Sequence, residues 1–548
     1  MPDNLLYYGD NLPVLRAHVP DESVDLVYLD PPFNSNQTYN VLFREKDGSA
    51  AAAQLKAFED TWHWDAAAVA DYQELVESGG KVSQALQAMR LLIGDGDMLA
   101  YLVRMAPRLA ELRRVLKPTG SLYLHCDPTA SHYLKALLDA IFGPAGYRNE
   151  IVWKRTCAHS SSKKFAPVHD VLLYYAKGKR PVWNEPRTDY DQEYLDKYYR
   201  FDDGDGRLYW RDNLCAAGVR HGRSGVAWHG IDPSAKGMHW KYTVERLEEL
   251  DAEGRIYWPP GGTMPQYKRY RDELKGKAVS DIWDDIDRIN PVGSERLGYP
   301  TQKPETLLER IIQASSNEGD TVLDPFCGCG TAVSVAQRLD RRWVGIDITH
   351  LAITLIRSRL RDAFGKEVEK GYKVIGEPAS VFDAVALAQQ DRYQFQWWAL
   401  SLVGACPVPP ERKKGADKGI DGRLYFHDNG SGKAKQIIFS VKSGTLKADD
   451  VRALLGVVER DGAAIGVLLT LHDPTDKMLA DAAGAGSYVS PFAGAKCPRI
   501  QILTVEELLS GQQVQIPPHR QTVAFPRAPR AKRERPAQGK LFGRQGAG

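Results

Sequence analysis

The chain has 548 residues, which is too long for one hydrophobic core and predicts two to four domains. The formal net charge is only +2, with 43% hydrophobic and 26% charged residues, so overall charge does not identify a polyanionic partner. The seven cysteines form no CxxC pair, no apolar stretch reaches the roughly 18 residues that span a bilayer, and the first residues do not resemble a signal peptide. These features exclude a secreted disulfide scaffold, and we expect a cytoplasmic protein with no membrane partner.

The first 150 residues alternate short apolar runs with amphipathic stretches, a pattern typical of part of an α/β domain. The runs SVDLVYLD (23–30) and GSLYLHCD (120–127) predict buried strands. Residues 98–120 predict an amphipathic helix that a proline and a glycine terminate. Residues 45–100, with the segment AFEDTWHWD, predict an insertion that either closes over a ligand or packs helices.

The segment LDPPF (29–33) ends the first predicted strand. Its two prolines stop the strand because they fix φ and donate no N–H. Asp30 therefore stands at the carboxyl end of a strand, where open α/β sheets bind their ligands. Taken alone, the segment predicts either a ligand site or a plain strand-ending turn.

Residues 151–290 differ from their neighbours because they are rich in Trp, Tyr, Lys, Arg and Gly and show weak periodicity. Basic side chains can neutralise phosphates, and aromatic rings can stack on bases. The alternative is that most of these aromatic rings build a small local core.

Residues 291–376 return to β/α alternation and predict a parallel sheet. The strand at 321–324 leads through DPFCGCGTA (324–332) into a helix, and a further strand ends at Asp347. An acidic residue at that place accepts hydrogen bonds from ribose hydroxyls in nucleotide sites.

Two glycines and two cysteines occupy the turn within DPFCGCGTA. Gly328 and Gly330 let the backbone turn tightly and approach a ligand. A plain strand-to-helix turn is the alternative. A metal or redox pair at Cys327 and Cys329 is disfavoured, because no further ligands are spaced for it.

Beyond a linker at 377–380, residues 385–515 predict a second, smaller α/β domain. It contains the motifs GADKGIDGRLYF (415–426) and QIIFSVKSG (436–444). Residues 516–548 are basic and rich in Pro and Gly, which predicts a disordered tail.

Together, LDPPF and DPFCGCGTA resemble the catalytic motif and the S-adenosylmethionine loop of amino-group DNA methyltransferases. The catalytic motif comes first and the cofactor loop last, an order that resembles the beta class, which includes type III modification subunits. The resemblance implies a doubly wound, circularly permuted α/β sheet with its catalytic half in 1–150, a target-recognition region in 151–290 and its cofactor half in 291–376. With YYGDNLPVL (7–15) and GYPTQKP (298–304), it implies these cofactor-binding residues: Asp10, Thr301, Lys303, Asp324, Pro325, Phe326, Gly328, Gly330, Thr331 and Asp347.

The same resemblance gives LDPPF a catalytic role. An exocyclic amino nitrogen is a poor nucleophile because its lone pair is delocalised into the ring. The Asp30 carboxylate and the Pro31 carbonyl would accept its two N–H bonds, Pro32 would help to fix that carbonyl, and Phe33 would stack on the extruded base. In the family, an Asp at this place goes mostly with adenine N6 and a Ser with cytosine N4, so adenine is favoured. The alternatives are cytosine N4, an RNA substrate and a non-catalytic DNA-binding module.

The partner that the resemblance implies is double-stranded DNA. A separate restriction subunit and a homodimer are further expectations from the class. By its place in the family, residues 151–290 recognise the target site. Candidate phosphate contacts there are Lys154, Arg155, Lys163, Lys164, Arg220 and Arg223.

The C-terminal motifs resemble the PD-(D/E)xK nuclease fold, and more narrowly the Mrr-like restriction endonucleases. The resemblance implies that Asp421 ends one strand and binds Mg²⁺, and that Lys442 helps to activate water. Gln396 is a candidate auxiliary ligand. Ser440 occupies the place of the usual acid or amide, and a hydroxyl binds Mg²⁺ less strongly than a carboxylate. The domain is therefore either an active nuclease, which would make the chain a bifunctional methyltransferase–endonuclease, or a degenerate domain that binds DNA or a partner.

Overall fold

The computed structural model describes most of the chain, in two units. The predictions for Phe33, Lys163 and Lys164 lie outside the described residues. One unit comprises Met1–Asn184 and Asp281–Arg533, and the other comprises Glu185–Ser280 and Glu534–Gly548. The described residues are 4–32, 38–44, 50–59, 63–158, 165–261, 264–290, 293, 295–297, 299, 301–407, 419–427, 435–490, 494–517, 520–522 and 528–531.

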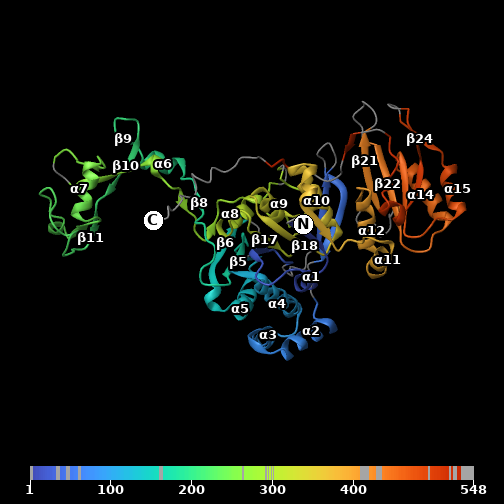
Figure 1. Cartoon of the computed structure of the whole chain (residues 1–548), viewed down its shortest axis with the longest axis horizontal. Coiled ribbons are helices and arrows are strands. Elements are labelled where there is room, and N and C mark those ends of the chain that lie inside the picture. The colour runs from blue at the N-terminus through green and yellow to red at the C-terminus, as the bar shows by residue number, and fades with distance from the viewer. Residues whose placement is uncertain are drawn as a thin grey trace. The chain divides into compact units, whose positions relative to one another are not determined.

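A nine-stranded sheet forms the centre of the first unit, with the strand order β16-β6-β7-β5-β2-β17-β18-β1-β19 (Figure 1). Every pairing is parallel except those of β7, which is antiparallel to both β5 and β6. β2 is buried along its whole length, as its continuous apolar run predicts. The strands are β1 (Asn4–Tyr8), β2 (Val24–Leu29), β5 (Leu116–Cys126), β6 (Tyr147–Lys154), β7 (His169–Ala176), β16 (Ile282–Trp283), β17 (Thr321–Asp324), β18 (Arg342–Asp347) and β19 (Tyr372–Ile375).

Helices cover both faces of this sheet. Figure 1 shows α4 and α5 on one side and α8, α9 and α10 on the other. Leu102, Leu109 and Leu137, from α4 and α5, pack into one core with β2 and β5. The helices are α1 (Asn11–His18), α4 (Asp97–Val115), α5 (Ser131–Phe142), α8 (Glu305–Ser315), α9 (Thr331–Arg338) and α10 (His350–Phe364).

The predicted insertion at 45–100 contains the second strand of a hairpin and two helices. β3 (Thr38–Arg44) pairs antiparallel with β4 (Ala50–Glu59). α2 (Ala66–Glu77) and α3 (Gly80–Ile93) pack on α4 and α5. Among the described residues, no helix is both long enough and apolar enough to cross a membrane.

The second unit covers fewer residues than the predicted target-recognition region at 151–290. Its main segment is Glu185–Ser280, because β6 and β7 belong to the central sheet. Its own small core forms around Trp228, Trp240 and Leu247, so several of the aromatic rings in this region are structural. Its elements are β8 (Arg187–Thr188), α6 (Gln192–Tyr198), β9 (Phe201–Asp202), β10 (Leu208–Asn213), β11 (Cys215–Ala217), β12 (Met238–Trp240), α7 (Val244–Ala252), β13 (Ile256–Tyr257), β14 (Gln266–Tyr270) and β15 (Lys277–Ala278).

The C-terminal part of the first unit builds a six-stranded sheet on its own hydrophobic core. The predicted tail contributes β27 to this sheet, because its backbone pairs with the free edge of β21. The elements are α11 (Val381–Gln390), α12 (Arg392–Leu402), β20 (Cys406–Pro407), β21 (Gly422–His427), β22 (Lys435–Lys442), α14 (Ala448–Arg460), β23 (Ile465–Thr470), α15 (Asp476–Gly484), β24 (Ser487–Val489), β25 (Lys496–Pro498), β26 (Ile500–Thr504), α16 (Val505–Leu509) and β27 (Arg520–Thr522).

Candidate active site

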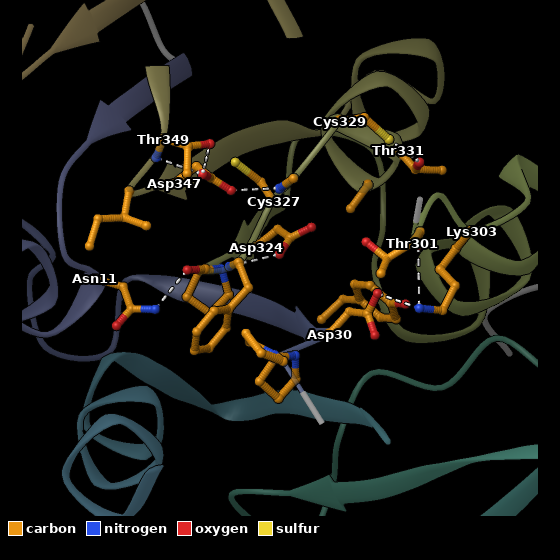
Figure 2. A pocket seen from close by; sticks show the side chains of 18 of the residues that line it. Asn11, Asp30, Thr301, Lys303, Asp324, Cys327, Cys329, Thr331, Asp347 and Thr349 are labelled. Atoms are coloured by element: carbon orange, nitrogen blue, oxygen red, sulfur yellow. Dashed lines mark hydrogen bonds and ion pairs between the residues drawn. The ribbon is translucent and has the colours of Figure 1, made fainter. Parts of the chain in front are cut away.

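A pocket of about 370 Å³ lies at the carboxyl edge of the central sheet (Figure 2). β2 runs parallel to β17, and β17 runs parallel to β18, so the ends of these strands meet at one edge. The two predicted motifs therefore line a single cavity. The predicted site residues in its wall are Asp10, Asp30, Pro31, Pro32, Thr301, Lys303, Asp324, Pro325, Phe326, Gly328, Thr331 and Asp347.

Asp30 directly follows β2, and the ammonium of Lys303 donates a hydrogen bond to its carboxylate Oδ2. Figure 2 shows the two side chains pointing toward one another. Both are largely buried, with 15% of the Asp30 side chain and 11% of the Lys303 side chain exposed. The sequence resemblance associates Lys303 with the cofactor, whereas its nearest charged partner is the acid of the catalytic motif.

The glycine loop between β17 and α9 needs its glycines for two reasons. Gly328 and Gly330 have φ values of +49° and +73°, which favour glycine. In addition, a Cβ on Gly330 would lie 2.7 Å from Ile356 Cγ1, so the loop packs closely on α10. Gly330, which the resemblance assigns to the cofactor, is not among the described residues that line the pocket.

Asp347 ends β18 and accepts three hydrogen bonds. Gly328 N–H, Thr349 N–H and the Thr349 hydroxyl all donate to its carboxylate at 2.9 Å. Burial raises the pKa of Asp347 from 3.8 to about 6, although these hydrogen bonds oppose the shift. Burial likewise holds the pKa of Asp324 well above its ordinary value.

Asp10 also lines the pocket, and its carboxylate is occupied by protein contacts. Its carboxylate caps α1 through Leu12 N–H at 2.9 Å and pairs with Arg108 at 2.8 and 2.9 Å. Arg108 also donates to Asn11, whose amide donates to the Pro325 carbonyl at 2.8 Å. These contacts join α1 and α4 to the loop after β17.

The C-terminal motif residues meet at a different sheet. Asp421 directly precedes β21 rather than ending a strand, because β21 runs antiparallel to β22 and starts beside the end of that strand. Its Oδ2 accepts a 2.7 Å hydrogen bond from Val441 N–H and a 3.4 Å hydrogen bond from the Ser440 hydroxyl. Gln396 donates to the Asp421 backbone carbonyl at 3.3 Å.

Lys442 faces another partner, because its ammonium lies 3.2 Å from Asp450 Oδ1 on α14. Within the part of the chain that the structure describes, no three His, Cys, Asp or Glu side chains converge as metal ligands. The described residues therefore do not fit a Mg²⁺ site built from several carboxylates.

The sequence matches two protein families. A family model described as DNA methylase matches residues 24–358, and one described as restriction endonuclease matches residues 410–508. The chain belongs to the DNA methylase family. The predicted resemblance and fold class are confirmed, and the chain is a DNA methyltransferase of the restriction–modification type with a restriction-endonuclease-like domain at its C-terminal side.

Curated relatives of this methylase include the Type II methyltransferase M.EcaI of Enterobacter cloacae. It is 32% identical over 361 residues, which cover 66% of this chain and 69% of the relative. The Mod subunit of the Type III restriction-modification enzyme StyLTI of Salmonella typhimurium is 27% identical over 395 residues, covering 68% of this chain and 55% of that protein. Among solved structures, the M1.HpyAVI–SAM complex aligns with a TM-score of 0.31 and 13% identity, covering 65% of this chain and 98% of that chain.

The candidate DNA contacts of the methylase are spread over both units. Lys154 ends β6 and is exposed, and Arg155 pairs with Asp170 at 3.0 Å. Arg220 and Arg223 are exposed in the second unit.

A buried polar chain beside Asp30 was not predicted. The Tyr28 hydroxyl lies 3.0 Å from His125 Nδ1, and His125 Nε2 lies 3.2 Å from Asp170 Oδ2. Burial and the nearby charge of Lys303 lower the pKa of His125. Burial disfavours ionisation of Asp170, but the hydrogen bond from His125 and nearby positive charges outweigh burial and hold its pKa below the ordinary value. The neutral ring therefore donates through Nε2 to the carboxylate, and Nδ1 accepts the Tyr28 proton.

A polar residue inside an apolar strand run was the available sequence signal for His125. Its position in GSLYLHCD interrupts the apolar run, and the register of β2 with β5 sets it opposite the Asp30 end of β2. No comparable signal marks Arg359, which lies on α10 and donates to the Cys329 carbonyl at 3.3 Å and to the Thr331 hydroxyl at 3.1 Å. Cys327 and Cys329 are both free and buried.

Proposed function

We propose that this methylase transfers a methyl group from S-adenosylmethionine to N6 of an adenine extruded from duplex DNA. The single observation that carries the proposal is the shared cavity. The Asp30 carboxylate, the strand-ending prolines, the glycine loop and Asp347 all line one pocket at the carboxyl edge of the sheet.

The pocket fits the cofactor by the chemistry of its donors and acceptors. Asp347 offers a carboxylate for ribose hydroxyls at the end of β18, and the loop around Gly328 brings backbone close to the cavity without a Cβ. Phe326 and Ile348 supply apolar wall. When bound, S-adenosylmethionine supplies an electrophilic methyl group on a sulfonium sulfur.

The protein's contribution is to hold the amino group of the base. Asp30 accepts one N–H, and the carbonyl of Pro31 accepts the other, which concentrates electron density on the nitrogen. Proline restricts the backbone here, so the carbonyl is a fixed dipole rather than a mobile one. Orientation of this kind can lower a barrier by about 7–11 kcal/mol for well-placed reactants.

Adenine is proposed over cytosine because the motif that the chain resembles opens with an aspartate. The test is long-read sequencing of DNA from a methylation-free host that expresses the chain, which reports the modified base and its sequence context together. We expect N6-methyladenine at one defined motif, and at least 1,000-fold less in Asp30→Ala. N4-methylcytosine would overturn the choice of base, and normal methylation by Asp30→Ala would overturn the mechanism.

DNA cleavage by the C-terminal domain is a second candidate function. The match to restriction endonucleases supports it, whereas the described residues around Asp421 do not form a Mg²⁺ site of several carboxylates. Supercoiled plasmid should then be nicked in the presence of Mg²⁺ by the intact chain and not by Lys442→Ala. Equal nicking by the variant, or an intact plasmid under all metal and cofactor conditions, would contradict this function.

A further inference from the structure

Lys303 reaches Asp30 from a distant part of the sequence. It lies two residues before α8, 273 positions after Asp30, and donates to Oδ2 of that carboxylate. Among the described residues, no other group hydrogen-bonds the Asp30 carboxylate. Both side chains are largely buried, and a buried ion pair of this kind costs desolvation that good geometry must offset.

The charge of Lys303 acts on three titratable groups near this end of β2. It contributes to the lowered pKa values of His125 and Asp170, and it opposes the rise in the pKa of Asp324. Its ammonium therefore influences the buried polar groups around Asp30 as well as Asp30 itself.

We propose that Lys303 is a positioning residue for Asp30. Its ammonium holds Oδ2 and fixes the carboxylate plane, which leaves Oδ1 to accept an N–H of the target amino group. The inference rests on the proposed function, since it assigns Asp30 the role of amino acceptor. It differs from a cofactor-binding role, in which Lys303 would act on S-adenosylmethionine independently of Asp30.

A double-mutant cycle separates the two roles. Lys303→Met removes the charge at nearly constant length, and Asp30→Asn removes its partner. We expect the single-turnover methylation rate at saturating cofactor to fall at least 100-fold in each single variant. The double variant should lie within threefold of Asp30→Asn, because the two side chains act as one unit.

Cofactor affinity provides a readout independent of turnover. In isothermal titration calorimetry, the dissociation constant for S-adenosylmethionine should change less than threefold in Lys303→Met. A loss of more than tenfold with a normal rate at saturation would overturn the proposal and make Lys303 a cofactor residue. A double variant at least 30-fold slower than Asp30→Asn would overturn it as well.

Controls distinguish positioning from general loss of structure. Lys117 pairs with Asp25 at 2.8 Å near the opposite end of β2, so Lys117→Met removes a matched ion pair outside the pocket and should leave the rate within twofold. Lys303→Arg keeps the charge and should recover at least tenfold over Lys303→Met. If Lys303→Met does not fold, the comparison of Asp30→Asn with the double variant still decides, because no unpaired buried carboxylate remains there. If the Asp30→Asn variant methylated DNA as fast as wild type, the proposed function itself would be refuted.

Discussion

The methylase pocket and the endonuclease-like domain each contain an aspartate and a lysine near strand ends, but the contacts of these side chains differ between the two sites. In the methylase pocket, Lys303 bonds Asp30 directly, although 273 positions separate them. In the endonuclease-like domain, Asp421 bonds the backbone of Val441, while Lys442 pairs with Asp450 on α14. An aspartate and a lysine in a sequence motif therefore do not by themselves determine whether the two side chains contact each other.

The difference follows from how each sheet is built. Parallel strands bring their carboxyl ends to one edge, where loops from distant segments converge on Asp30. Antiparallel β21 and β22 bring Asp421 beside Ser440 and Val441, which follow it by 19 and 20 positions, and the Val441 N–H and the Ser440 hydroxyl both donate to the carboxylate. The methylase site is thus assembled from far apart in the sequence, and the C-terminal site from close by.

Among the variants that compare the two sites, the largest expected effect disrupts the methylase pocket and leaves the other site intact. Gly330→Ala should weaken S-adenosylmethionine binding at least 30-fold in calorimetry. A left-handed backbone costs an alanine about 1–2 kcal/mol, and the new Cβ would lie 2.7 Å from Ile356 Cγ1. Gly419→Ala is the matched control in the C-terminal domain, because its φ of +72° is the same but its Cβ meets nothing nearer than Val457 at 3.5 Å. Equal loss of cofactor affinity in the two variants would contradict the steric argument.

The second effect is the pH dependence of the same pocket. Because the pKa of Asp347 is raised to about 6, cofactor affinity should rise as the pH increases from 5 to 7 and the carboxylate ionises. Hydrogen bonds to charged groups contribute about 1.5–3 kcal/mol, which corresponds to a roughly 10- to 150-fold loss in Asp347→Asn at pH 7.5. The variant should also show no pH dependence in this range. A parallel pH dependence in wild type and variant would assign the titration to another group.

Asp347→Asn should lose cofactor affinity at pH 7.5 but should not lose stability against unfolding. The pKa of this carboxyl in the folded chain, about 6, exceeds its ordinary value of 3.8, so its contribution to stability is present below pH 3.8 and is lost as the pH rises through 6. At pH 7.5 the variant should melt no lower than wild type in calorimetry. A lower melting temperature would mean that the hydrogen bonds of Asp347, rather than its burial, dominate.

Many of the residues that line this pocket could be predicted from the sequence, whereas the contacts between their side chains could not. The strand-ending prolines, the glycine turn and Asp347 are local signals, and the structure brings them into one cavity. The pairing of Lys303 with Asp30 depends on tertiary contacts that no local pattern encodes. For the same reason, Asp421 was expected at the end of a strand and instead precedes one, since an antiparallel partner can place either strand end at a site.

A smaller effect is expected when the C-terminal site is given the carboxylate that it lacks. Ser440→Asp sets a second acid beside Asp421, and carboxylates are preferred ligands of hard cations. Mg²⁺ affinity, measured by calorimetry, should increase at least tenfold. Ser443→Asp adds the same charge one residue beyond β22 and should bind as weakly as wild type. If both variants gain Mg²⁺ affinity equally, the increase is a general charge effect. The methylation rate should be unchanged in both variants.

The smallest expected effect concerns His125, the buried histidine beside Asp30 in the methylase site. Burial lowers the pKa of His125, so the folded chain keeps this ring neutral while the unfolded chain protonates it near pH 6.5. Stability is therefore present above about pH 6.5 and is lost as the pH falls toward the folded value, because protons bind the unfolded state more tightly. Between pH 7.5 and 5.5, this loss should lower the melting temperature by roughly 2–4 °C per kcal/mol in a domain of this size. His125→Gln should lack that part of the shift, and His472→Gln, which changes an exposed histidine of the C-terminal domain, should retain it. If His125→Gln followed the same pH curve as wild type, the ring would take up its proton equally readily in the folded and the unfolded chain, and burial would not hold it neutral.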